Sequence, residues 1–192
     1  LLCDTYWGRQ DKIEGIVRQN PRLLSIKGNC TDLSKRQFNG ITAFQYAWWA
    51  CDWYMWRMMI KYMDKAEVLR QVDEIESNRL SWVSSHGQEF DISGLTKAYD
   101  NYLSNFEGWS HEQRKDAWCK DVGGQQRLLP AHVISEYCRA DRDMEDPNFR
   151  DEKELPRQGV GGEHEKDVDP SGIAWWMFKS YDDHHDILGH GW

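Results

Sequence analysis

The sequence has no compact cluster of lysine and arginine residues, which argues against a nucleic-acid partner. Its 32 acidic residues outnumber its 24 basic residues, giving a formal net charge of -8 at pH 7. Affinity for nucleic acid comes largely from Lys and Arg side chains that neutralise phosphates. An acidic surface instead fits a soluble protein whose partners are proteins. We therefore expect another protein as the partner, and the sequence leaves the oligomeric state open.

Five cysteines are present, and no two of them form a C-x-x-C pair. Their odd number and irregular spacing favour buried free thiols in a reducing compartment. We therefore expect a cytoplasmic protein. The first residues lack the basic segment and apolar run of a signal peptide. Because the chain starts with Leu1 and not with methionine, we expect a fragment or a processed product.

Motifs for nucleotide binding and for cysteine catalysis are also missing. The glycines at 159, 161 and 162 follow no predicted strand and carry no phosphate-loop lysine. Cys138 lies six residues after His132, and Cys119 lies eight residues after His111. Neither spacing brings a base into contact with the thiol on one helix. No catalytic residue is predicted, and an enzyme is the less favoured class.

The longest apolar stretch runs from Ala43 to Met63 and contains four of the eleven tryptophans. Thr42 is placed to cap a first helix, and Asp52 interrupts the stretch and can cap a second. A membrane-spanning helix needs about 20 apolar residues, but the charges inside this stretch make a single span costly. We expect two short helices folded against each other. Their predicted inner faces are Phe44, Ala47, Trp48 and Cys51 on the first, and Trp53, Trp56, Met59 or Ile60, and Met63 on the second.

The rest of the chain predicts a mainly α fold, in which further helices cap this helical hairpin, with a short β-finger and a small extended C-terminal segment. Turn formers place the finger at about 25–38, and residues 78–90 have extended character. In the helix predicted at 65–77, Val68, Leu69, Val72 and Ile75 are expected inside and Gln71 outside. The other helices are expected at about 10–19, 93–105, 110–122 and 130–138, and Ser110 with Gln113 has the pattern of a capping box at the start of the third.

The composition changes after residue 140. Residues 141–170 contain eleven acidic and five basic residues and few large apolar ones. Such a segment buries little surface and is typical of a solvated loop. The predicted organisation is therefore a helical domain at 1–140, an acidic loop or linker at 141–170, and a docked C-terminal segment at 171–192.

The pattern Gly40-x-Thr42-x-Phe44-x-x-Ala47, followed by a second apolar helix, resembles one ankyrin repeat. The family pattern is G-x-T-P-L-H-x-A, so Ala43 replaces its proline and Gln45 its histidine. With a preceding segment that is similar to the close of another repeat, the resemblance covers about residues 12–63. It implies stacked helical hairpins and a protein-binding role. Such tryptophan-rich segments also resemble those of secreted effector proteins of intracellular bacteria, which implies secretion into a host cytosol as the alternative location. Because a repeat cannot bury its own faces, the helices downstream are expected to complete the core.

A histidine and aspartate cluster near the C-terminus is the alternative functional signal. These residue types are common ligands of divalent metals. Part of the cluster resembles the H-D motif of metal-dependent phosphohydrolases, with Leu188 as an extra residue. The alternative function is thus a metal-dependent hydrolase with a divalent cofactor, whereas the favoured function needs no cofactor. The candidate ligands are His184, His185, Asp186 and His190.

The favoured function is a protein–protein interaction module without catalytic activity, which binds through the finger and an exposed aromatic surface. Adjacent residues point in different directions in a helix, so one member of the Trp48-Trp49 pair is expected to be exposed. We choose Trp49 as that contact residue. The full set of predicted binding residues is Lys27, Asn29, Lys35, Arg36, Trp49 and Tyr54.

Overall fold

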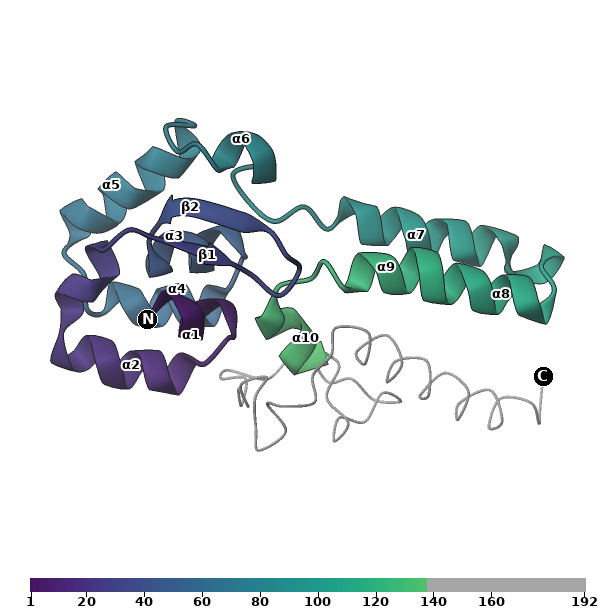
Figure 1. The fold of residues 1–192 in the computed structure, drawn as a ribbon, viewed down its shortest axis with the longest axis horizontal. Helices are drawn as coiled ribbons and strands as arrows, with labels where there is room; N and C mark the ends of the chain where they lie inside the picture. The colour runs from purple at the N-terminus through teal and green to yellow at the C-terminus, as the bar shows by residue number, and fades with distance from the viewer. Residues whose placement is uncertain (138–192) are drawn as a thin grey trace. The chain divides into compact units, whose positions relative to one another are not determined.

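The structure of the chain is a computed structural model that describes residues 1–137 (Figure 1). These residues form two compact units, one of Leu1–Asp91 with the described residues from Pro130 onward, and one of Ile92–Leu129. Helices dominate both units, and the first contains a two-stranded antiparallel sheet. The predicted mainly α class with a short β-finger is confirmed. The segments predicted at 141–170 and 171–192 lie outside the described residues, and the single domain over 1–140 stays a prediction.

The first unit places the β-finger and a helical hairpin among shorter helices. A short helix within 78–90 corrects the extended segment predicted there. Trp82 and Val83 are adjacent and both buried, which a helical turn allows and a strand that buries one face does not. The elements are α1 (Leu2–Tyr6), α2 (Gln10–Gln19), the 3₁₀ turn η1 (Pro21–Ser25), β1 (Gly28–Thr31), β2 (Gln37–Ile41), α3 (Ala43–Trp49), α4 (Trp53–Ile60), α5 (Lys65–Glu76), α6 (Val83–His86) and α10 (Ala131–Tyr137).

The helical hairpin of α3 and α4 begins at the two predicted capping residues. The Thr42 hydroxyl accepts the backbone N–H of Gln45 at 3.0 Å, and the Gln45 side chain accepts the N–H of Thr42 in return. The Asp52 carboxylate accepts the N–H of Met55 at 3.0 Å at the start of α4. Both helices are therefore short, and no helix of residues 1–137 is long and apolar enough to cross a membrane.

The β-finger contains a bulge beside the start of α3. Gly28 pairs with Ile41 and Cys30 with Phe38, so the second strand has one residue more than the first between these pairs. Gly40 takes a positive φ of 71° within the bulge, a conformation that glycine adopts at little cost. The Asn29 side chain accepts the N–H of Gly40 at 2.9 Å. Asn29 thus holds the bulge in shape.

Two hydrophobic clusters pack against opposite faces of α3, and this corrects the predicted exposure of Trp49. The Trp49 side chain is 1% exposed, its ring centroid lies 4.8 Å from that of Phe38, and its indole N–H donates to the carbonyl of His86. Trp48 is the partly exposed member of the pair. Since the finger covers the second face of α3, both faces are buried. The two clusters consist of Ile13, Val17, Leu24, Ala43, Phe44, Ala47, Met55, Met58 and Met59, and of Phe38, Ile41, Tyr46, Trp49, Ala50, Ile75, Leu80, Trp82 and Val83.

The predicted inner face of α4 is also wrong for its first turn. Trp53 is 49% exposed, while Met55, Met58 and Met59 are buried. The methionines follow the i, i+3, i+4 spacing of one helical face, so they compete with the tryptophans for the core. Methionine adapts its shape to irregular gaps, which suits it to the narrow space between α3 and α4.

Helix α5 buries a polar residue that was expected outside. Gln71 is 0% exposed and Leu69 is 58% exposed, the reverse of the prediction for both. The Gln71 amide donates to the carbonyl of Leu24 at 3.1 Å and to the Glu67 carboxylate at 2.8 Å, and its oxygen accepts the Thr42 hydroxyl proton. These hydrogen bonds offset the cost of burying the amide. They also join α5 to the start of α3 and to η1.

The carboxylate of Glu67 makes the stability of this network depend on pH. Hydrogen bonds from Arg70 and Gln71 lower the Glu67 pKa from 4.5 to about 2. A depressed carboxyl pKa stabilises the fold above the unfolded pKa, so this contribution is full above pH 4.5 and lost as pH falls toward 2. We expect Glu67→Gln to lower the free energy of unfolding by about 1 kcal/mol at pH 7, given the partly exposed ion pair with Arg70.

Urea unfolding of the chain and of the Glu67→Gln variant between pH 3 and pH 7 tests this expectation. The difference between the two proteins should shrink below pH 4.5. The exposed Asp100, in the interior of α7, supplies the control, since Asp100→Asn should match the parent chain at every pH. A difference for Glu67→Gln that stays constant down to pH 3 would contradict the assigned pKa.

The second unit consists of a helix followed by a nearly continuous helical run. Its elements are α7 (Ser93–Asn105), the 3₁₀ turn η2 (Phe106–Gly108), α8 (His111–Ala117), the π-helical turn η3 (Trp118–Val122) and α9 (Gly123–Gln126). The predicted capping box is confirmed, because the Ser110 hydroxyl accepts the N–H of Gln113 and the Gln113 side chain accepts the N–H of Ser110. Tyr102 is buried against the ring of Trp118, at 5.1 Å between centroids.

Candidate functional site

Most of the predicted finger residues serve the fold itself. Lys27 forms an ion pair with Glu74 at 3.0 Å, and Asn29 supports the bulge. Arg36 lies 3.6 Å from the Asp32 carboxylate and stacks over the rings of Trp49 and Phe90. Lys35 is exposed in the turn between the strands. The structure therefore leaves Lys35 as the finger residue that is best presented to a partner.

The other predicted site residues do not gather in one place. Trp49 is buried, as described above, and Tyr54 is half-buried in the first turn of α4. Within residues 1–137, no group of three or more His, Cys, Asp or Glu side chains could hold a metal ion. The metal ligands predicted at His184, His185, Asp186 and His190 lie outside the described residues, so the hydrolase alternative stays a prediction.

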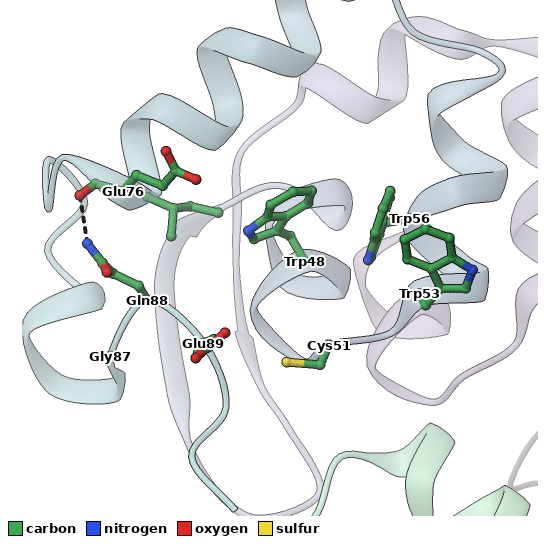
Figure 2. Close-up of a pocket in the computed structure, with 9 residues that line it drawn as sticks. Trp48, Cys51, Trp53, Trp56, Glu76, Gly87, Gln88 and Glu89 are labelled. Atoms are coloured by element: carbon green, nitrogen blue, oxygen red, sulfur yellow. Dashed lines mark hydrogen bonds between the residues drawn. The ribbon is translucent and has the colours of Figure 1, made fainter.

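A groove of about 660 Å³ in the first unit lies between the helical hairpin and the loop that follows α6 (Figure 2). Three tryptophans and Cys51 form one side, and acidic and amide side chains form the other. Such a concave site with aromatic and a few polar groups is typical of a binding site. We call it the tryptophan groove. Its lining residues are Trp48, Cys51, Trp53, Trp56, Ile75, Glu76, Gly87, Gln88 and Glu89.

The tryptophans of the groove form a contiguous row of rings. The ring centroid of Trp56 lies 5.0 Å from that of Trp48 and 4.5 Å from that of Trp53, where the two rings meet edge to face. Edge-to-face and tilted pairs are favourable arrangements of aromatic rings. Trp48 comes from α3 and the other two from the first turns of α4, so the hairpin fixes the row. The half-exposed Trp53 ends the row toward solvent.

The loop side of the groove is tied to the rest of the first unit by hydrogen bonds. Gly87 ends α6 with a positive φ of 78°, which turns the chain toward the groove. The Gln88 side chain donates to the carbonyl of Glu76 at 2.6 Å (Figure 2). The N–H of Phe90 donates to the carbonyl of Trp49 at 2.7 Å. Gln88 and Glu89 are therefore held beside the C-terminal end of α5.

Cys51 lines the groove, but its surroundings oppose thiolate chemistry. Burial raises the pKa of the Cys51 thiol, and the nearby Glu89 carboxylate raises it further. A nucleophilic cysteine needs a lowered pKa. Cys51 and Cys3 are exposed, so the prediction of buried thiols is wrong for these two, while the four cysteines of the described residues are free. The groove is thus better suited to binding than to cysteine catalysis.

The sequence held one signal for this groove, and it was assigned to the wrong face. Trp53 and Trp56 share a helical face at i, i+3, which we predicted as the inner face of α4. The competing face with Met55 and Met58 fills the core instead. Glu76, Gln88 and Glu89 gave no signal, because only the fold of residues 77–90 brings them to the hairpin.

Comparison with known proteins shows similarity to a protein of Coxiella burnetii. Residues 94–167 match the family model described as the CBUA0006 C-terminal domain. The match starts within two residues of Ile92, where the second compact unit begins. No solved structure matches the chain. A relative titled "Uncharacterized protein CBUA0006", from Coxiella burnetii strain RSA 493 / Nine Mile phase I, is 34% identical over 174 residues. The aligned residues cover 79% of this chain and 51% of the relative, so the chain spans about half the length of the relative.

Proposed function

We propose that this chain is a protein-binding module without catalytic activity, and that its main binding surface is the tryptophan groove. The observation that carries the proposal is the partly exposed aromatic row of Trp48, Trp53 and Trp56 beside a polar loop. Tryptophan is enriched among the residues that dominate binding energy at protein interfaces. The exposed turn of the finger, with Lys35, is proposed as a second contact surface.

The similar Coxiella protein bears on where this chain would meet its partner. Coxiella is a host-dwelling bacterium, and a Coxiella burnetii protein is similar to this chain. This similarity supports a search for the partner among host proteins as well as bacterial ones. The role of a secreted effector, and the ankyrin-like nature of residues 12–63, remain parts of the proposal.

The test compares capture of proteins by the full chain and by two variants. Trp53→Ala and Trp56→Ala remove parts of the row, and Leu103→Ala is the control, because Leu103 is 68% exposed in the second unit. We expect a protein retained by the chain and by the control but lost by both tryptophan variants. With that protein purified, loss of Trp53 should weaken the affinity roughly 30-fold, the effect of an interface hot spot of about 2 kcal/mol.

A partner that binds equally well to all variants would place the interface elsewhere and contradict the proposal for the groove. Failure to capture a specific partner from host and bacterial extracts would contradict the binding function itself. Because Trp53 is half-exposed, circular dichroism of each variant should match that of the parent chain, which separates lost binding from lost folding.

A further inference from the structure

We infer that the tryptophan groove recognises a basic segment of its partner, whose Lys or Arg side chain lies on the tryptophan rings and faces two carboxylates across the groove. This inference rests on the proposed function and specifies its ligand. Three features of the groove carry it: the charge of its lining, the direction of the helices that end there, and the behaviour of arginines elsewhere in the chain.

The charge of the lining has one sign. Glu76 and Glu89 contribute carboxylates, and no Lys, Arg or His lines the groove. Among the residues that the structure describes, neither carboxylate forms an ion pair, whereas Glu67 and Glu74 of α5 are paired with Arg70 and Lys27. The two carboxylates are therefore available to a cationic ligand.

The helices around the groove add to its negative potential. Glu76 is the last residue of the twelve-residue helix α5, and the C-terminal end of a helix carries a partial negative charge. Trp48 lies at the end of α3, and Gly87 follows the last residue of α6. The N-terminal end of α4 also reaches the groove at Trp53, but there the Asp52 carboxylate caps it.

Arginines of this chain already bind aromatic faces. The guanidinium of Arg57 lies 5.3 Å from the ring centroid of Trp53, and that of Arg36 lies 5.5 Å from the ring of Trp49. A cation is attracted most strongly by the tryptophan ring. A ligand cation on Trp48 or Trp56 would have the same contact, together with the carboxylates across the groove. An acidic or apolar segment would lack the favourable interaction of a positive charge with the tryptophan rings and the carboxylates.

Nuclear magnetic resonance of the ¹⁵N-labelled indole N–H groups tests the inference on the full chain. The probes are the blocked pentapeptides Gly-Ala-Lys-Ala-Gly and Gly-Ala-Arg-Ala-Gly, the same peptide with norleucine or glutamate at the centre, and tetramethylammonium chloride. Tryptophan-to-phenylalanine variants assign the resonances of Trp48, Trp53 and Trp56. We expect the Lys and Arg peptides to shift these resonances in a saturable manner, and the glutamate peptide to leave them unchanged.

Variants of the carboxylates provide the second readout. Glu76→Gln and Glu89→Gln should each weaken binding of the Lys peptide about two- to fivefold, the effect of an exposed charge pair, and added salt should weaken it further. Glu112→Gln, an exposed carboxylate of α8, is the matched control and should leave the affinity unchanged.

Three results would overturn the inference. Equal binding of the norleucine and Lys peptides would show an apolar groove without charge selection, while the proposed protein-binding function would stand. Binding of tetramethylammonium as tight as that of the Lys peptide would indicate a site for small cations instead of a protein segment. No shift of the three resonances with any probe would reject the ligand class, and the capture experiment would then decide the proposed function separately.

Discussion

Replacement of Trp49 by alanine is expected to lower the free energy of unfolding by about 3–5 kcal/mol, the usual cost of removing a buried aromatic side chain. The ring contacts Phe38, Tyr46 and Phe90, and its indole N–H donates to the carbonyl of His86. Truncation leaves a cavity and removes the hydrogen bond to the partly buried carbonyl of His86, and each contributes to the loss. Since a domain is stable by only about 5–15 kcal/mol, this change removes a large share of the stability.

Trp53→Ala is the matched control, because it removes the same side chain from the same hairpin at a half-exposed position. Its expected cost is about 1 kcal/mol, mainly from the contact with Trp56. Urea unfolding followed by far-UV circular dichroism measures both variants without relying on tryptophan fluorescence. Equal costs for the two variants would contradict the assignment of Trp49 to the core and of Trp53 to the groove.

The local signals that start and end helices were readable from the sequence. Thr42, Asp52 and Ser110 were each predicted as caps, and each accepts a backbone N–H in the structure. A cap acts within one turn, so its effect does not depend on the rest of the fold. The starts of the two hairpin helices and of α8 followed from these signals.

The direction in which the apolar helices face was not readable. Helix α4 is apolar around most of its circumference, so the Trp53 and Met55 faces fit the helical spacing equally well. The choice depends on how much space α3 and α2 leave beside α4, which is a property of the assembled unit. The same limit explains Trp49, whose burial depends on the finger covering a second face of α3. The candidate groove was therefore missed even though its tryptophans were noted.

For helix α5 the prediction failed for a different reason. It relied on hydropathy alone, which placed Leu69 inside and Gln71 outside. The residues that face the first unit are Val68, Gln71, Val72 and Ile75, which keep the i, i+3, i+4, i+7 spacing strictly. Helical geometry thus favours Gln71 over Leu69 at this face. Glu67 lies one helical turn away, but the other two partners of the buried amide, Thr42 and Leu24, come from other elements, and only the folded unit brings them to Gln71.

Gln71→Leu is expected to lower the free energy of unfolding by about 2–4 kcal/mol, although leucine is apolar and similar in size. The change leaves the carbonyl of Leu24 without its donor and the hydroxyl proton of Thr42 without its acceptor in a buried site, and each such loss costs about 1–3 kcal/mol. Gln19→Leu, at an exposed position of α2, is the control and should change stability by less than about 0.5 kcal/mol. Urea unfolding of both variants gives the comparison.

A double variant separates the hydrogen bonds from packing. Replacing both partners of the Thr42–Gln71 hydrogen bond by apolar groups of similar shape leaves neither of its two atoms unsatisfied. The lost cap of α3 and the unpaired Leu24 carbonyl already count in the single changes, so Thr42→Val combined with Gln71→Leu should cost less than the sum of the two. If the costs simply add, the Thr42 hydroxyl and the Gln71 amide are not coupled. If Gln71→Leu alone is neutral or stabilising, the face of α5 is set by apolar spacing, and the amide network adds nothing to the stability of the first unit.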